Sequence, residues 1–191
     1  MLLPLASKDL VLTTSRLYIR APQRSDYSDW AMGRRISRKH LETWEPQWPP
    51  DALSREDWSR RLKAWRAGWR NDRAYVFMIF NRETGALLGG ASVTNIRRGP
   101  SQSGALGYWL LADATGQGVM AEAVDCVCWW AFQSLGLARL EAGTLPENTR
   151  SRRVLKRCGF EEEGIARDFL EINGQRRDHI LYARLQRAEA Q

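Results

Sequence analysis

The sequence is poor in the residues from which metal sites and disulfide frameworks are built. Its 191 residues include three cysteines, Cys126, Cys128 and Cys158, and two histidines, and no Cys-x-x-Cys pair occurs. This spacing excludes the common structural zinc sites. We expect the cysteines to be small buried side chains of a protein in a reducing compartment.

Long apolar runs are missing as well. The longest, such as Ala105–Ala112, fall far short of the roughly 20 residues that a membrane helix needs. Residues 1–9 are briefly apolar but contain no basic leader, so they lack the layout of a secretory signal. We therefore expect a cytoplasmic protein without a membrane partner.

Basic residues are in excess. Lysine and arginine number 29 against 22 acidic residues, which gives a net charge of +7. Such a charge suits a phosphate-bearing ligand or nucleic acid. The arginines are scattered in pairs such as Arg34-Arg35 and Arg152-Arg153, however, which is more typical of a solvated surface than of a binding groove. Charge alone leaves both interpretations open.

The hydrophobic pattern predicts one domain over residues 1–191, with its core at about 12–185, because no repeat or linker interrupts it. Proline breaks the pattern in a loop around Trp44 and Trp48. Strands are expected at 12–20, 75–80, 86–96, 104–112 and 137–145 and on both sides of Asn173-Gly174, and helices at 23–35, 54–70, 120–135 and 148–157.

The order of these elements predicts the fold class. A strand, a helix and a second strand over 104–145 imply a crossover and a locally parallel pair, whereas the hairpins imply antiparallel pairing. We expect an α/β (α+β) fold in which a mixed, mostly antiparallel twisted sheet carries helices on both faces.

A Gly-x-Gly turn lies between the strand at 104–112 and the helix that follows. Gly116 and Gly118 let the backbone bend and approach a ligand, and the first helical turn offers unpaired N–H groups to an anion. A tight turn without a ligand has the same pattern. No Gly-Lys-Ser/Thr follows, so this is not a Walker loop, and one of the three Rossmann glycines is missing.

A second segment further along starts at Pro146. Asn148 is a residue type favoured at a helix N-cap, and Ser151 falls in the first turn. Each is typical of an ordinary helix when taken alone. The two segments together are much less expected by chance.

The order strand, Gly-x-Gly, helix, strand, Asn-x-x-Ser and Gly-Phe resembles the GNAT acetyltransferases, most closely the ribosomal-protein-alanine N-acetyltransferases. Four further stretches are similar to that group, and together they extend over about 12–185: residues 12–17, 38–46, 116–123 and 173–179.

The resemblance implies that acetyl-CoA, as co-substrate, lies in a splayed gap between the parallel strands at 104–112 and 137–145. Asn148 would meet the pantetheine, and Ser151 would protonate the leaving thiolate. The amine attacks directly, so neither a protein nucleophile nor a metal is needed. Backbone groups of Leu110 and Leu111 would bind the pantetheine, and the pyrophosphate would lie on the amides of Gly116, Gln117, Gly118, Val119 and Met120.

Two positions depart from the family pattern. Asp113 stands where the loop often carries Gln or Arg, and Leu155 stands where many relatives have a tyrosine acid. The acid role is therefore given to Ser151. The general base stays open among the carboxylates of Glu141, Asp168 and Glu45, each of which is also typical of a salt bridge or cap.

The absence of an obvious strong base favours an α-amine acceptor. Near pH 7.5 roughly a third of α-amines (pKa ~8) are neutral, against about one in a thousand lysines (pKa ~10.4). Trp44 and Trp48 are expected to wall the acceptor site, with Glu45 attracting an ammonium group. Aromatic packing within the loop explains the same residues equally well.

The expected partner is thus a peptide or protein N-terminus, with a ribosomal protein as the acceptor that the resemblance suggests. A small-molecule amine is the alternative acceptor. A non-catalytic CoA-sensing or RNA-binding protein is the second alternative, but Leu41–Trp48 holds no Lys or Arg to accompany its aromatics. No direct binding of nucleic acid is required, and the oligomeric state stays open between monomer and homodimer.

Overall fold

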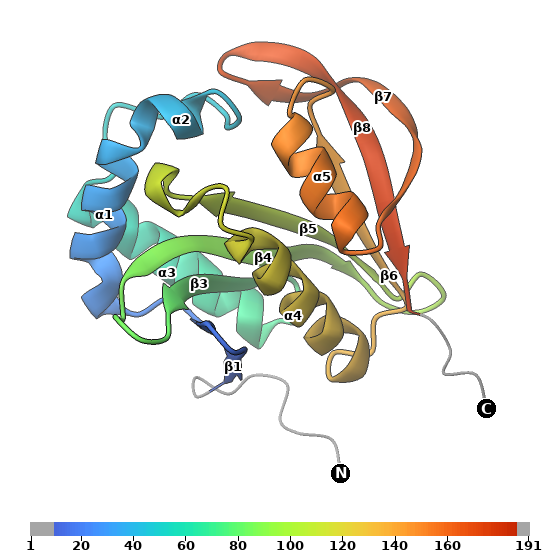
Figure 1. Cartoon of the computed structure of the whole chain (residues 1–191), viewed down its shortest axis with the longest axis horizontal. Helices are drawn as coiled ribbons and strands as arrows, with labels where there is room; N and C mark the ends of the chain where they lie inside the picture. The colour runs from blue at the N-terminus through green and yellow to red at the C-terminus, as the bar shows by residue number, and fades with distance from the viewer. Residues whose placement is uncertain (1–9, 187–191) are drawn as a thin grey trace.

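The structure is a computed structural model that describes residues 10–186. Residues 1–9, considered above for a secretory signal, and the two ends of the predicted domain lie outside the described residues. Eight strands form one sheet in the order β1-β2-β3-β4-β5-β6-β8-β7 (Figure 1). Among the described strands β5 and β6 pair in parallel and all other neighbours are antiparallel, which confirms the mixed, mostly antiparallel sheet.

The elements have the following bounds. The strands are β1 (Val11–Thr13), β2 (Leu17–Arg20), β3 (Tyr75–Asn81), β4 (Leu87–Arg97), β5 (Ser103–Leu110), β6 (Arg139–Thr144), β7 (Glu161–Ile172) and β8 (Gln175–Leu185). The helices are α1 (Tyr27–Ile36), α2 (Arg38–Glu42), α3 (Arg55–Arg70), α4 (Val119–Gln133) and α5 (Thr149–Arg157), with short 3-10 turns at Arg24–Asp26 and Ala112–Ala114.

Local sequence signals account for several boundaries. Ser54 caps α3, since its Oγ accepts a hydrogen bond of 2.9 Å from the N–H of Asp57. Asn173 and Gly174 both have positive φ, 47° and 78°, and form the predicted two-residue turn between β7 and β8.

Two expectations need correction. The single strand at 12–20 is a hairpin of β1 and β2, because Thr14 turns the chain: its Oγ1 accepts from the N–H of Leu17 at 3.0 Å. The short helix α2 was not expected. It follows α1 with Ser37 between them and precedes the proline-rich loop.

The sheet separates two apolar layers. In β3 the side chains of Tyr75, Phe77 and Ile79 belong to the cluster packed against α4, whereas Met78 and Phe80 pack against α1 and α3. Figure 1 accordingly shows α4 and α5 on one side of the sheet and α1 and α3 on the other, as predicted. No helix within residues 10–186 is both long and apolar enough to cross a membrane.

The parallel pair opens into a wedge. β5 and β6 pair only where Ser103, Gly104 and Ala105 lie opposite residues 139–141. Beyond that point β5 continues along β4 as far as Leu110, and β6 continues along β8 as far as Thr144. The strands therefore diverge toward their C-terminal ends, which confirms the predicted splayed pair.

Candidate active site

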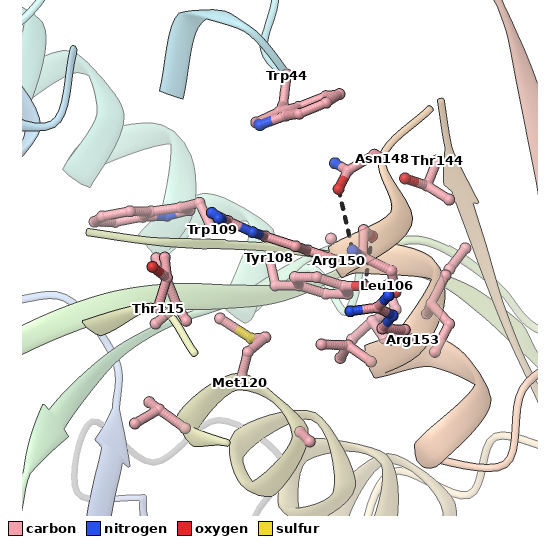
Figure 2. A pocket seen from close by; sticks show the side chains of 18 of the residues that line it. Trp44, Leu106, Tyr108, Trp109, Thr115, Met120, Thr144, Asn148, Arg150 and Arg153 are labelled. Carbon is pink, nitrogen blue, oxygen red and sulfur yellow. Dashed lines mark hydrogen bonds between the residues drawn. The ribbon is translucent and has the colours of Figure 1, made fainter. Parts of the chain in front are cut away.

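A cavity of about 700 Å³ occupies the wedge between β5 and β6. Its walls come from the ends of both strands, the starts of α4 and α5, and α2 with the loop after it. Figure 2 shows Trp44 on one side of the β5 side chains Tyr108 and Trp109, with Met120 of α4 on the other. The cavity thus has a wall from each of the two helical layers.

The Gly-x-Gly loop presents an open cradle to this cavity. Gly116 and Gly118 have φ of +79° and +76°, a left-handed backbone that favours glycine. A Cβ placed on Gly116 would meet nothing within 4 Å, and one on Gly118 would meet only Arg16 Nη2, at 3.6 Å. The backbone N–H groups of 116–120 have no backbone acceptor within residues 10–186. This geometry fits a bound anion such as a pyrophosphate. Asp113, the unfavourable carboxylate, is not among the lining residues.

The strand β5 offers Leu110 rather than Leu111 to a ligand in the wedge. The N–H of Leu111 donates to Leu88 at 2.9 Å, and its carbonyl accepts from Ala114 at 3.1 Å. Backbone groups in an antiparallel strand point alternately to its two sides. Tyr108 and Leu110 occupy the positions that alternate with that of Leu111. Their N–H and C=O groups therefore point away from β4 and toward the wedge.

At the start of α5, Asn148 and Ser151 both line the cavity. The Asn148 Oδ1 accepts from the N–H of Ser151 at 3.0 Å (dashed in Figure 2), so Asn148 is an N-cap. Its amide nitrogen has no hydrogen-bond partner within residues 10–186 and can donate to a ligand. The capping and ligand-binding interpretations are therefore compatible.

Tyr108 is one of the residues that the sequence analysis missed. Its hydroxyl lies 2.8 Å from the Ser151 Oγ, although the two residues are 43 positions apart. Burial raises the pKa of Tyr108 well above its usual value, so the phenol is protonated at neutral pH and can donate to Ser151. Leu155, at the position of the family's tyrosine, is buried in the core. A phenol therefore still reaches α5, but it comes from Tyr108 on β5 and not from the position of Leu155.

In the loop after α2, Trp44 and Glu45 line the cavity and Trp48 does not. Both oxygens of Glu45 bind the buried guanidinium of Arg34. The Trp48 Nε1 donates to Glu45 at 2.8 Å, and its ring lies 4.6 Å from the Arg34 guanidinium carbon. The Glu45 carboxylate is therefore occupied by partners within the fold.

The other carboxylates considered as bases lie elsewhere. Glu141 pairs with Arg97 and Arg139, and Asp168 is exposed on β7; neither lines the cavity. Within residues 10–186 no group of three or more His, Cys, Asp or Glu side chains is arranged to hold a metal ion.

Comparison with known proteins identifies the family. The family described as an acetyltransferase (GNAT) domain matches residues 16–161. The chain belongs to the GNAT acetyltransferases. It is 34% identical to a Bacillus subtilis protein named probable N-acetyltransferase YjcK, with 91% of this chain and 96% of the relative covered. It is 33% identical to the Escherichia coli [ribosomal protein uS5]-alanine N-acetyltransferase, with 90% and 89% covered. The structure of Mycobacterium smegmatis RimJ in complex with CoA-disulfide superposes with a TM-score of 0.84 at 32% identity, covering 88% of this chain and 81% of that one.

Membership in the family confirms that this GNAT chain is an acetyltransferase, and the non-catalytic alternative is set aside. Both histidines of the sequence, His40 and His179, line the cavity of the enzyme. The small number of histidines argues only against zinc sites. Their positions are the better indication of a role in the active site, because each falls in a stretch that carries the family resemblance, 38–46 and 173–179.

Three arginines of α5 form a basic stripe along the cavity of this GNAT enzyme. Arg150, Arg153 and Arg157 all line it, and none has a carboxylate partner within residues 10–186. Arg152, which is not a lining residue, pairs with Glu162 at 3.6 Å. The stripe and the free amides of 116–120 border the same cavity, which concentrates positive potential there.

Proposed function

We propose that this enzyme transfers the acetyl group of acetyl-CoA to the N-terminal α-amine of a protein, with a ribosomal protein as the acceptor. The observation that carries the proposal is the cavity in the wedge, which is lined both by the Gly116-x-Gly118 loop with its free N–H groups and by the aromatic side chain of Trp44. The relative named as a uS5-alanine N-acetyltransferase supports the acceptor class. Such an acceptor would place the enzyme in the cytoplasm.

The cavity supports a specific binding mode for acetyl-CoA, in keeping with the CoA-disulfide complex of the M. smegmatis enzyme. The pyrophosphate lies on the N–H groups of Gly116, Gln117, Gly118, Val119 and Met120, next to the arginine stripe of α5. The pantetheine runs along the free backbone groups of Leu110, and the amide nitrogen of Asn148 donates to it.

The acid step is assigned to Ser151. The amine attacks the thioester carbon, and the sulfur that leaves takes a proton from the Ser151 Oγ. Tyr108 lies 2.8 Å away and is held protonated by burial, so its hydroxyl can pass a proton from solvent back to Ser151. The two hydroxyls act as a pair, in which Ser151 gives its proton to the sulfur and Tyr108 supplies Ser151.

The acceptor end favours an α-amine. Trp44 remains the proposed wall of the acceptor site, because Glu45 and Trp48 are bound to Arg34 and to each other. No carboxylate base is free in the cavity, so an amine that is partly neutral at physiological pH is the better acceptor.

The test uses two peptides with the same alanine-initiated sequence and one internal lysine, one with a free and one with a blocked N-terminus. Release of CoA at pH 7.5 is expected to be roughly a hundredfold or more faster with the free N-terminus, since the neutral fractions of the two amines differ by about 300. Polyamines serve as a third acceptor and should react poorly. Equal rates on the two peptides would remove the α-amine assignment, and a preference for the polyamine would support the small-molecule alternative.

The cofactor assignment is tested at Gly118. A valine there places a branched side chain in the open cradle and should weaken binding of acetyl-CoA at least tenfold, measured by calorimetry. Gly85 in the β3–β4 turn is the matched control, because its φ of +73° and its empty surroundings are similar while it lies outside the cavity. Gly85→Val should lose comparable stability from backbone strain and keep its affinity. Equal affinities of the two folded variants would overturn the assignment of the pyrophosphate to this loop.

A further inference from the structure

His179 has the geometry of an oriented base. It lies on β8 with 3% of its surface exposed, and it lines the cavity. Its Nδ1 is 3.0 Å from the carbonyl oxygen of Arg177. A carbonyl can only accept, so Nδ1 carries the proton and the lone pair of the neutral ring resides on Nε2. Nε2 has no hydrogen-bond partner within residues 10–186.

The ring is held on two further sides. It packs at 5.6 Å from the ring of Phe169 on β7, edge to face. A Cβ on Gly143 of β6 would lie 3.7 Å from the His179 Cδ2, the atom next to Nε2. Gly143 lines the cavity as well. The imidazole therefore lies over the end of β6, at the edge of the wedge.

His179 and Ser151 belong to opposite faces of the sheet. Tyr182 of β8 faces α5, since its hydroxyl accepts from Arg152 Nε at 3.2 Å, and Ile180 belongs to the same core cluster. Side chains alternate along a strand, so His179 points to the other face. Ser151 approaches the cavity from α5. A base on one face and an acid on the other suit a reaction in which the amine enters opposite the leaving thiolate.

We propose that His179 is the general base that accepts the proton of the attacking amine; this rests on the proposed function for the identity of the amine. The neutral amine forms the C–N bond, and its nitrogen gives one proton to His179 Nε2. The C–S electron pair leaves on sulfur, which takes a proton from Ser151 Oγ. His179 then releases its proton to solvent, and a proton from solvent returns to Ser151 by way of the Tyr108 hydroxyl, so the products are an amide and a thiol.

The assignment explains how the enzyme works without a carboxylate base. A nitrogen that has bonded to the carbonyl carbon is strongly acidic, so a neutral imidazole can take its proton. The amine must reach the site already neutral, which excludes almost all lysine amines near pH 7. His179 as base therefore adds to the preference for an α-amine.

The second histidine is less suited to the role. Burial, followed by the nearby guanidinium of Arg150, lowers the pKa of His40, and no hydrogen bond to a described residue orients its ring. The charged groups near His179 are Glu147 and Arg177, which pair with each other. The strands packed against its ring contribute the uncharged Gly143 and Phe169.

The experiment measures kcat and KM from pH 5.5 to 9 with an alanine-initiated peptide. His179→Asn keeps a donor for the Arg177 carbonyl but has no base, and its kcat is expected to fall at least about a hundredfold, with acetyl-CoA affinity within about threefold of wild type. The pH profile of kcat/KM should change shape in the variant, because the wild type requires both an unprotonated base and a neutral amine, whereas the variant requires only the neutral amine. Added imidazole should restore part of the activity of His179→Ala.

Two results would overturn the assignment. One is a kcat for His179→Asn equal to that of wild type. The other is a loss of the same factor at every pH without rescue by imidazole, which would make His179 a structural residue. Failure of the proposed function looks different, because wild type itself would then not turn over the peptide. The same profiles would be recorded with the amine that it does accept.

Discussion

Ser151→Ala is expected to lower kcat by about 10² to 10⁴ while the affinity for acetyl-CoA changes little. An acid that protonates the departing thiolate contributes chiefly in the transition state. Tyr108→Phe should show a comparable loss, because it removes the hydroxyl that lies 2.8 Å from the Ser151 Oγ. Burial raises the pKa of Tyr108, so the phenol stays protonated as pH rises and its contribution persists through pH 9.

The double variant separates a shared role from two independent ones. If the two hydroxyls form one relay, Ser151→Ala/Tyr108→Phe should be scarcely slower than either single variant. Rapid-mixing measurements of CoA release give kcat, and calorimetry gives the affinity for acetyl-CoA. Losses that multiply would assign the two residues separate roles. A loss confined to affinity would make Ser151 a ligand contact, and full activity would make it an ordinary residue of the helix surface.

Glu45→Ala is expected to lower the free energy of unfolding by about 3 kcal/mol, because it leaves a buried guanidinium without its counter-ion. Arg34 is 9% exposed and lies among the rings of Trp30, Trp48 and Trp109, at 4.6 to 5.8 Å from their centroids. Denaturant unfolding measures the loss.

Glu42→Ala is the matched control for this prediction. Glu42 lies in the same segment and pairs with the exposed Arg38, so its removal should cost less than about 1 kcal/mol. If Glu45→Ala is as stable as the control and instead raises the KM for the peptide, the carboxylate attracts the acceptor ammonium and its bond to Arg34 is secondary.

Features that depend on neighbouring residues could be predicted from the sequence. The turn at Asn173-Gly174 and the Gly116-x-Gly118 loop require positive φ, which is a local property of glycine and asparagine. Asn148 could be predicted as an N-cap for the same reason. The splayed strand pair came from the family resemblance, since hydrophobic periodicity does not show where two strands separate.

Features that depend on residues far apart in the chain could not be predicted from the sequence. The contact of Tyr108 with Ser151 spans 43 positions and the pairing of Glu45 with Arg34 spans 11, so neither leaves a pattern in a short window. The alternation of side chains along 104–112 does not show which residue the Tyr108 side chain faces. Three of the tryptophans before residue 110, Trp30, Trp48 and Trp109, surround the guanidinium of Arg34. Only the packed structure reveals this arrangement.

The central claim, acetylation of protein N-termini, is tested most directly by mass spectrometry of N-terminal peptides from cells with and without this protein. We predict that a small set of proteins, including a ribosomal protein whose mature N-terminus is alanine, loses its N-terminal acetyl group when the protein is absent. Re-expression of the wild type should restore the modification, and the Ser151→Ala variant should not. Unchanged acetylation of every N-terminus, with a small-molecule amine losing its acetyl group instead, would contradict the account.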